Sequence, residues 1–119
     1  MNGLVVIKRG AVDPVENPPF FPEILEGEPK TRAWRFSTAL DGRAAAGIWE
    51  STPGVWRMDY NGIWEFCSII EGSCIITPDG GVPVTLSAGD TFICEPGLSG
   101  TWRVTTTMQK YFAVIHPKR

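Results

Sequence analysis

Two separated half-motifs contain the residues whose types and spacing could support chemistry. The first runs from Glu65 across six residues to Gly72, and the second joins Gly89-Asp90 across five residues to Pro96-Gly97. Neither adjoins a histidine, and the single histidine, His116, follows the last predicted strand, where we expect a partly exposed side chain. A carboxylate enclosed by apolar side chains suits general acid–base work, because desolvation disfavours its charged form. Glu65 is therefore a candidate catalytic residue if its side chain is enclosed, and a surface carboxylate beside a turn is the alternative.

The elements that must position Glu65 are predicted to be strands. Short segments rich in Val, Ile, Thr, Trp and Phe recur from residue 33 onward with turn residues between them, which is typical of an all-β sandwich or barrel. We expect strands at 33–37, 44–51, 54–59, 64–71, 73–77, 82–86, 91–95, 101–106 and 108–115. Glycine supplies the positive φ that tight turns require, so turns are expected at Asp41-Gly42, Pro53-Gly54, Asn61-Gly62, Glu71-Gly72 and Asp79-Gly80-Gly81.

Side chains alternate across a strand, which places Glu65, Cys67, Ile69 and Glu71 on one face of the predicted strand 64–71. The residues between them share the opposite face. If Glu65 points into a barrel, Cys67 is its neighbour there.

The segment before the predicted barrel differs in composition. Residues 13–29 contain five prolines, which lack the backbone donor that a central strand needs. We therefore expect an extended arm. Its Phe20, Phe21, Ile24 and Leu25 are too apolar for a free linker, so the arm is expected to pack along the barrel or a partner subunit. With 119 residues the chain is predicted to be one domain, an N-terminal strand and arm over 1–32 and a barrel over 33–119.

Several segments together resemble the cupin superfamily, and in particular the short cupins grouped with the (S)-ureidoglycine aminohydrolase cupin domain. The ethanolamine-utilisation cupins are a related branch. The resemblance covers roughly residues 34–115 and is carried by Trp49-Glu50 with Thr52-Pro53-Gly54, Glu65-Phe66-Cys67 with Glu71-Gly72, Gly89-Asp90 with Pro96-Gly97, and Gly100-Thr101-Trp102. It implies an all-β cupin barrel of the jelly-roll type with the proline-rich arm preceding it. It also implies a hydrolase or lyase of a small polar metabolite such as a ureido or amino acid compound, with Glu65 in the lumen as acid–base and Tyr60 or Trp102 shaping the pocket.

The resemblance does not extend to the metal ligands. Cupins of this kind hold a metal with three histidines and a glutamate, whereas this chain has Asp59, Tyr60, Asn61 and Gly62 before Glu65 and Thr101-Trp102 where the third histidine would lie. We therefore expect no metal and no other cofactor. A weak oxygen and sulfur site made by Asp59, Asn61, Glu65, Cys67 and Cys94 stays open.

Aromatic and basic residues are candidates for ligand binding. Trp49, Trp56, Trp64 and Trp102 could enclose a planar or cationic ligand, or could simply form the core. Arg57 and Arg103 could pair with a carboxylate of the ligand, or could be solvated strand residues. We assign Glu65 and Tyr60 as catalytic candidates and, as substrate-binding candidates, Trp102, Arg57, Trp49 and Cys67.

Composition reduces the number of partner classes that the chain is expected to bind. The net charge of −2 without a basic stripe argues against nucleic acid, and no segment is long enough to span a membrane. The three cysteines, without CxxC spacing, are predicted to be reduced thiols of a cytoplasmic protein. We expect a small-molecule ligand and a homodimer. A non-enzymatic binding or sensor cupin, and a purely structural subunit, remain alternatives to an enzyme.

Overall fold

The structure is a computed structural model that describes residues 2–17 and 22–118. These residues form strands and no helix, which confirms the all-β expectation. The strands are β1 (Val15–Glu16), β2 (Glu23–Glu26), β3 (Thr31–Ala39), β4 (Ala44–Ser51), β5 (Gly54–Asp59), β6 (Trp64–Pro78), β7 (Val84–Ser87), β8 (Thr91–Cys94) and β9 (Ser99–Ile115). The described part of the chain accordingly contains no helix that could cross a membrane.

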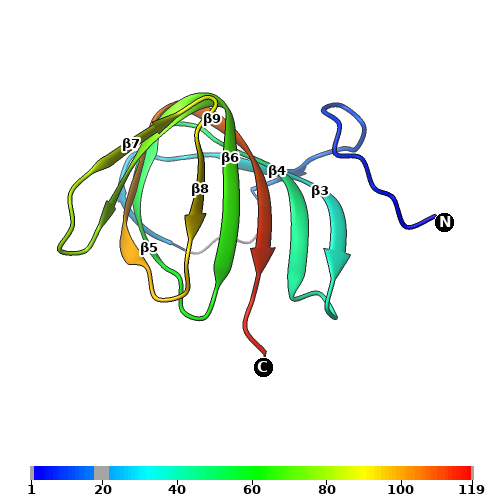
Figure 1. Ribbon diagram of the computed structural model, residues 1–119. Coiled ribbons are helices and arrows are strands. Elements are labelled where there is room, and N and C mark those ends of the chain that lie inside the picture. Colours follow the sequence, from blue (N-terminus) through cyan, green and yellow to red (C-terminus); the bar gives the residue numbers. More distant parts are fainter. Residues whose placement is uncertain (1, 18–21, 119) are drawn as a thin grey trace.

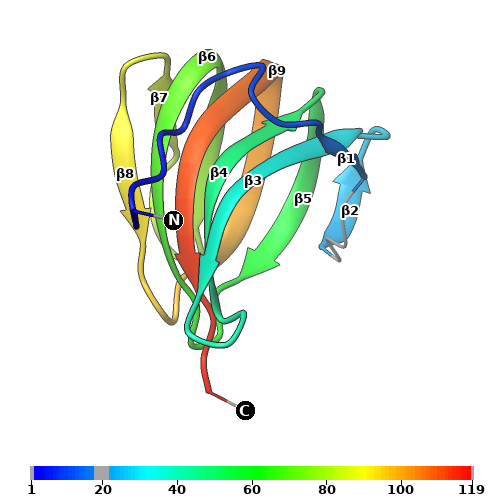
Figure 2. The same ribbon diagram turned by 90° about the vertical axis from the view of Figure 1, so that its right-hand side faces the viewer.

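The two long strands, β6 and β9, form the centre of one curled antiparallel sheet (Figures 1 and 2). β9 pairs with β6 along one edge and, along the other, with β5 through its first half and with β4 through its second half. The other edge of β6 pairs with β8 near the start of β6 and with β7 near the end of β6. Because each long strand bends between its two sets of partners, the sheet wraps around a lumen.

The predicted turn at Glu71-Gly72 is wrong, because β6 continues through it as one strand. The register of β6 against β9 shifts between Ile69 and Cys74, as in a β-bulge. Gly72 has a φ of +78°, and a Cβ there would lie 2.2 Å from the carbonyl oxygen of Thr107, so only glycine fits this close approach. The bulge moves Glu71 out of the predicted face: its side chain is 58% exposed and pairs with Arg9.

The segment before the barrel contains two short strands that the proline content argued against. β1 pairs with β3, and β2 pairs with β5, both antiparallel. Ile24 and Leu25 are about half exposed in β2, whereas Phe20 and Phe21 lie outside the described residues. These two strands occupy the ends of the strand order, where proline is tolerated nearby.

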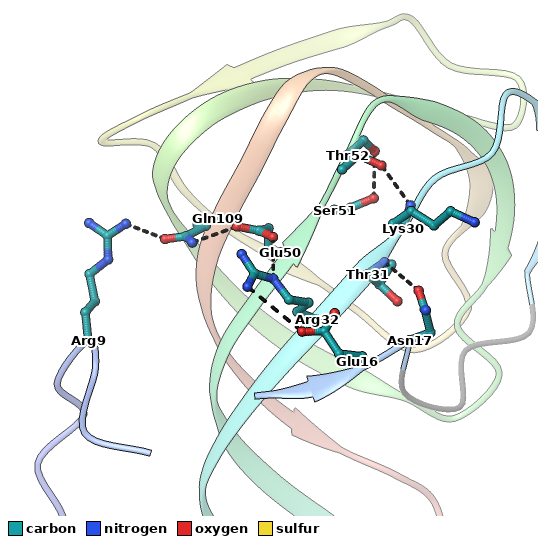
Figure 3. Close-up of polar contacts among 10 residues, drawn as sticks. All are labelled: Arg9, Glu16, Asn17, Lys30, Thr31, Arg32, Glu50, Ser51, Thr52 and Gln109. Atoms are coloured by element: carbon teal, nitrogen blue, oxygen red, sulfur yellow. Dashed lines mark hydrogen bonds and ion pairs between the residues drawn. The ribbon is translucent and has the colours of Figure 1, made fainter. Parts of the chain in front are cut away.

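A row of polar contacts crosses the outer surface of β1, β3, β4 and β9 (Figure 3). Glu16 pairs with Arg32, Arg32 donates to Glu50 at 2.8 Å, Gln109 donates to Glu50 at 2.8 Å, and Arg9 donates to Gln109. The hydrogen bond from Arg32 lowers the pKa of the Glu50 carboxyl. This row connects the N-terminal segment to the barrel wall, on the side away from the lumen.

The lumen is divided into a packed part and an open part. The packed core is formed by Ile69, Cys74, Ile76, Val104 and Met108, together with the buried rings of Trp56, Tyr60 and Trp102 and the Cys94 thiol. A cavity lies beside these rings and includes Glu65 in its wall. The rings therefore form the boundary between core and cavity.

Candidate functional site

The cavity has a volume of about 310 Å³ and opens to solvent, which is at the lower end of the range for small-molecule sites. Its walls come from β3, β4, β5, β6, β9 and the connections at their ends. The lining residues are Ala33, Arg35, Thr38, Gly42, Ala45, Trp49, Trp56, Met58, Tyr60, Ile63, Glu65, Trp102, Lys110, Phe112, Val114 and His116. Glu65, Tyr60, Trp102 and Trp49 were predicted from the sequence as site residues, and the structure brings them together here.

Glu65 lies near the start of β6, with a side chain that is only 14% exposed. The Tyr60 hydroxyl donates a hydrogen bond to its Oε1 at 3.0 Å, and the Lys110 ammonium donates one to its Oε2 at 3.3 Å. Each carboxylate oxygen therefore has its own donor. This arrangement fixes the orientation of the carboxylate in the cavity wall.

The second half-motif positions Tyr60. The Tyr60 amide donates to the carbonyl of Leu98, and the Gly97 amide donates to the carbonyl of Tyr60, at 2.8 and 2.7 Å. At the other end of this motif, the Ile69 amide donates to the Asp90 carbonyl at 2.9 Å. Backbone hydrogen bonds thus connect the two half-motifs in space. The second half-motif holds both the segment with Tyr60 and strand β6, which carries Glu65.

Lys110 is the functional candidate that the sequence analysis missed. Its side chain is only 5% exposed, and its Nζ lies 3.3 Å from Glu65 Oε2 and 3.3 Å from Cys67 Sγ. A signal was present in the sequence: Lys110 lies between Met108 and Phe112 at the spacing of an inward-facing apolar row. A lysine in such a row must be paired, since a buried unpaired ammonium is costly.

Two tryptophans enclose this ammonium. Lys110 Nζ lies 4.9 Å from the ring centroid of Trp49 and 4.7 Å from that of Trp102, within cation–π distance. Trp102 stacks on Trp56 with centroids 6.1 Å apart and an interplanar angle of 16°. Trp64 does not line the cavity. Two of the tryptophans that were considered for an aromatic box around a ligand therefore enclose a cation of the chain itself.

The protonation states of this cluster follow from burial and charge. Burial by itself lowers the pKa of Lys110, but the neighbouring Cys67 and Glu65 together raise it by more than burial lowers it. The net direction is upward, and the ammonium stays charged. Burial, with the charge of Glu65 adding to it, raises the pKa of the Tyr60 hydroxyl. Tyr60 and Lys110 therefore both keep their protons and act as hydrogen-bond donors to Glu65 at neutral pH.

Cys67, Cys74 and Cys94 are free and buried, in agreement with the prediction of reduced thiols. Cys67 contacts Lys110 but is not part of the cavity lining. Burial raises the pKa of the Cys67 thiol to about 12, although the charge of Lys110 acts in the opposite direction. The thiol is therefore a packing neighbour of Lys110 and not a ready nucleophile.

The two arginines proposed from sequence are engaged elsewhere. Arg57 forms ion pairs with Asp79 and Asp59, and Arg103 pairs with Glu26 at 3.2 Å, and neither lines the cavity. Arg35 lines it instead. The alternation of β3, in which Ala33 and Arg35 share a face, could have indicated this residue.

The residues around Glu65 do not fit a cupin metal. The ammonium of Lys110 donates a hydrogen bond to Oε2 of the carboxylate. An ammonium cannot be a metal ligand, and its positive charge repels a metal ion. Within residues 2–17 and 22–118, no three His, Cys, Asp or Glu side chains are grouped to hold an ion. His116 lines the cavity and is exposed. Its amide donates a hydrogen bond to the Arg43 carbonyl, and its carbonyl accepts one from Arg43 Nε.

Taken together, the cavity presents a carboxylate held by two hydrogen-bond donors, with a permanent positive charge beside it and aromatic rings around it. Such a site can exchange a proton with a bound molecule and can stabilise negative charge on it. It can also bind a planar polar molecule without reaction.

Comparison with known proteins identifies the fold and the family. Residues 38–112 match the family described as the EutQ-like cupin domain. The chain is similar to a protein of unknown function from Pseudomonas syringae pv. tomato, of the DUF861 family, with 25% identity and a TM-score of 0.79 over 91% of this chain and 46% of that one. No curated protein gives a significant match.

Two further solved structures share the fold. The EutQ protein of Clostridium difficile is 17% identical, with a TM-score of 0.61 over 73% of this chain and 63% of that one. Ectoine synthase from P. lautus is 18% identical, with a TM-score of 0.64 over 74% of this chain and 65% of that one. The chain spans about half the length of the Pseudomonas protein and under two thirds of these two. The cupin fold expected from the sequence is confirmed, and the chain belongs to the EutQ-like cupin domain family.

Proposed function

We propose that this chain binds a small polar metabolite in the barrel cavity and acts on it as a hydrolase or lyase, with Glu65 as general acid–base. The observation that carries the proposal is the cluster of Tyr60, Glu65 and Lys110 in the cavity wall, in which each oxygen of the carboxylate has one donor. An acid–base group held in one orientation next to a ligand cavity is an arrangement that proton transfer requires.

Each member of the cluster has a distinct part in this proposal. Glu65 takes a proton from, or returns one to, the bound molecule. The charge of Lys110 stabilises negative charge that develops on a carbonyl or carboxylate oxygen of the ligand, a task that a metal performs in other enzymes. Tyr60 keeps Glu65 in place and, because burial raises its pKa, stays a donor throughout. The finer assignment, a reaction of the ureidoglycine aminohydrolase type, is one member of this proposed class.

A second candidate function is non-enzymatic binding. It is favoured by one observation: the ammonium of Lys110 is enclosed by Glu65, Cys67, Trp49 and Trp102, so that its charge is largely satisfied within the protein. A cluster closed in this way can serve as a rigid polar wall of a sensor or carrier pocket. Binding without turnover would be the result expected from that alternative.

The test begins with a ligand screen, since three tryptophans line the cavity and report on it by fluorescence. Small acids, ureides and amines are titrated against the protein, and each compound that binds is followed by proton NMR for conversion. For a compound that is converted, Glu65→Gln should lower kcat at least 100-fold, because the amide cannot exchange the proton. Glu71→Gln is the matched control, on the same strand and also paired with a cation, but outside the cavity.

Loss of turnover in both variants, or in neither, contradicts the role of Glu65. Binding without conversion of any compound supports the non-enzymatic alternative. Elemental analysis of the same preparation checks the metal expectation: we expect less than about 0.1 equivalent of transition metal after dialysis, because Lys110 repels a cation from Glu65. One equivalent of manganese, iron, nickel or zinc would overturn that expectation.

A further inference from the structure

One cation in the wall of the cavity has no counter-charge in the described part of the protein. Arg35 lines the cavity from β3 and is exposed to solvent. Within residues 2–17 and 22–118, its guanidinium forms no side-chain hydrogen bond or ion pair. The other two candidate arginines, Arg57 and Arg103, both have carboxylate partners.

The charge of the cavity lining is therefore positive. Its charged side chains are Arg35, Glu65 and Lys110, with His116 adding a further positive charge when protonated. Glu65 and Lys110 neutralise each other at 3.3 Å. The charge left over is that of Arg35, and an uncompensated cation in a cavity wall favours an anionic ligand.

The wall next to Arg35 is built from small residues, which leaves space for a ligand. Ala33 precedes Arg35 on the same face of β3, and Ala45 lines the cavity from β4. The Cα partner of Arg35 on β4 is Gly47. Gly47 itself does not line the cavity: a Cβ there would lie 1.9 Å from the carbonyl oxygen of Trp34, which shows a close backbone approach of β3 and β4.

A second unpartnered group lies at the inner boundary of the cavity. Trp102 is 97% buried and lines the cavity, and its indole N–H has no hydrogen-bond partner in the described structure. A buried donor without an acceptor is costly. The nitrogen itself has almost no accessible surface, so an acceptor atom of a bound ligand reaches it only when a neighbouring side chain of the cavity wall shifts. The stacked rings of Trp56 and Trp102 favour a flat ligand.

We propose that the ligand of this cavity is a small planar carboxylate, whose carboxylate pairs with Arg35 and whose inner end accepts a hydrogen bond from the Trp102 indole. A planar guanidinium pairs with a carboxylate through two parallel hydrogen bonds, which distinguishes it from a neutral amide. A volume of about 310 Å³ has room for roughly ten water-sized groups at about 30 Å³ each, which suits a ligand of about that many non-hydrogen atoms. This inference names the ligand class of the proposed function and rests on it.

The test uses matched pairs of probes that differ only in charge: benzoate with benzamide, and nicotinate with nicotinamide. Affinity is measured by isothermal titration calorimetry up to millimolar probe concentration. We expect each acid to bind at least tenfold more tightly than its amide. Arg35→Gln should lower the affinity for the acids about tenfold and leave that for the amides within twofold, whereas Arg35→Lys should restore part of the loss.

Arg103→Gln is the control, because it removes an exposed strand arginine outside the cavity. This variant should change neither the affinity for the acids nor that for the amides. Nicotinate, which has a ring nitrogen as acceptor, should bind more tightly than benzoate, and Trp102→Phe should remove that difference. Melting temperatures of all variants establish that each one folds.

The outcomes separate the two proposals. Amides that bind as tightly as their acids, or an acid preference that survives in Arg35→Gln, overturn the assignment of the carboxylate to Arg35 while the cavity remains a binding site. No heat signal from acids or amides at millimolar concentration contradicts the small-molecule site itself, and the assignment of its ligand class falls with it.

Discussion

The ion pair between Glu65 and Lys110 is the residue-level feature that most changes the interpretation of this chain. A lone buried carboxylate could be replaced by an amide with little effect on stability, and the sequence indicated only the carboxylate. With Lys110 at 3.3 Å, the same replacement leaves an ammonium buried without its counter-charge. Removing one partner of a buried pair is strongly destabilising, often by 3–5 kcal/mol, whereas removing both can be neutral.

Our first prediction is therefore a double-mutant cycle. We expect Glu65→Gln and Lys110→Met each to lower the free energy of unfolding by about 3 kcal/mol, and the double variant to lose less than either single variant does. Urea unfolding followed by tryptophan fluorescence measures all four proteins. Additive losses would show that the two side chains do not interact energetically.

The second prediction concerns alkaline pH and follows from the buried thiols. Burial raises the pKa of Cys67 to about 12 and that of Cys74 to about 11, from 9.0 in the unfolded chain. Between these values the unfolded chain loses protons that the folded protein keeps, so the free energy of unfolding falls as pH rises above about 9. Lys110, whose pKa is also raised, adds to the loss above 10.5.

Urea unfolding at pH 7.5, 9, 10 and 11 measures this slope. Cys67→Ala should make the decline shallower, even though the cavity it creates lowers stability at every pH. Ser68→Ala, on the same strand, is the control and should leave the slope unchanged. Equal stability of the wild-type protein at pH 7.5 and 10.5 would contradict the burial of these thiols.

At the scale of elements, the bulge in β6 decides which side chains enter the lumen. Before the bulge, Glu65, Cys67 and Ile69 face inward, and after it Cys74 and Ile76 do. The inward positions change from odd to even residue numbers at Gly72. One long strand can therefore contribute both to the cavity wall and to the packed core.

Our third prediction compares two glycines that both have positive φ. Gly72→Ala would place a Cβ 2.2 Å from the Thr107 carbonyl oxygen, whereas a Cβ on Gly80 has nothing within 4 Å. Gly80→Ala should cost only about 1–2 kcal/mol, from the backbone conformation. Gly72→Ala should cost more than about 3 kcal/mol, because steric overlap is added to the same strain. Thermal and urea unfolding compare them, and equal losses would argue against a tight bulge.

At the scale of the whole molecule, apolar side chains remain exposed on the outer surface. Phe66 on β6 and Ile93 on β8 are Cα partners and are 37% and 50% exposed, and Ile115 on β9 is 37% exposed. The N-terminal segment also exposes apolar side chains, Leu4, Val5 and Val6, as it leaves the barrel wall beyond β3 (Figure 1). Of these, the cross-strand neighbours Phe66 and Ile93 form adjacent exposed apolar surface, which is a feature of protein interfaces.

The fourth prediction is accordingly a homodimer in solution that buries the outer surface of β6 and β8. Light scattering at tens of micromolar should report twice the 13.1 kDa mass of the chain. Phe66→Lys combined with Ile93→Lys should yield a monomer, because two desolvated charges oppose association. Val84→Lys, an exposed apolar residue on β7, is the control and should stay dimeric. A wild-type monomer would reject the prediction, and a dimeric double variant would move the interface elsewhere.

The sequence by itself determined the location of most strands and most of the turns. It divided β9 wrongly into 101–106 and 108–115 and β6 into 64–71 and 73–77, and it did not predict β1 and β2. Local alternation and turn glycines depend on residues close in the chain, so β4 and β5 were predicted with their observed bounds. The half-motifs likewise identified Glu65 and, through the connection before it, Tyr60. The turn at Glu71-Gly72 was wrong because a glycine with positive φ serves a bulge as well as a turn, and only the pairing of β6 with β9 distinguishes the two.

Only the tertiary structure decided the chemistry around Glu65. Lys110 is 45 residues from Glu65 in the chain, and no local pattern specifies that an inward-facing lysine of β9 meets an inward-facing glutamate of β6. The choice among arginines has the same origin: Arg57 and Arg103 find carboxylates on neighbouring segments, while Arg35 faces the cavity. Charge pairing depends on distances between strands. The curl of the sheet sets these distances, whereas the order of residues along the chain does not.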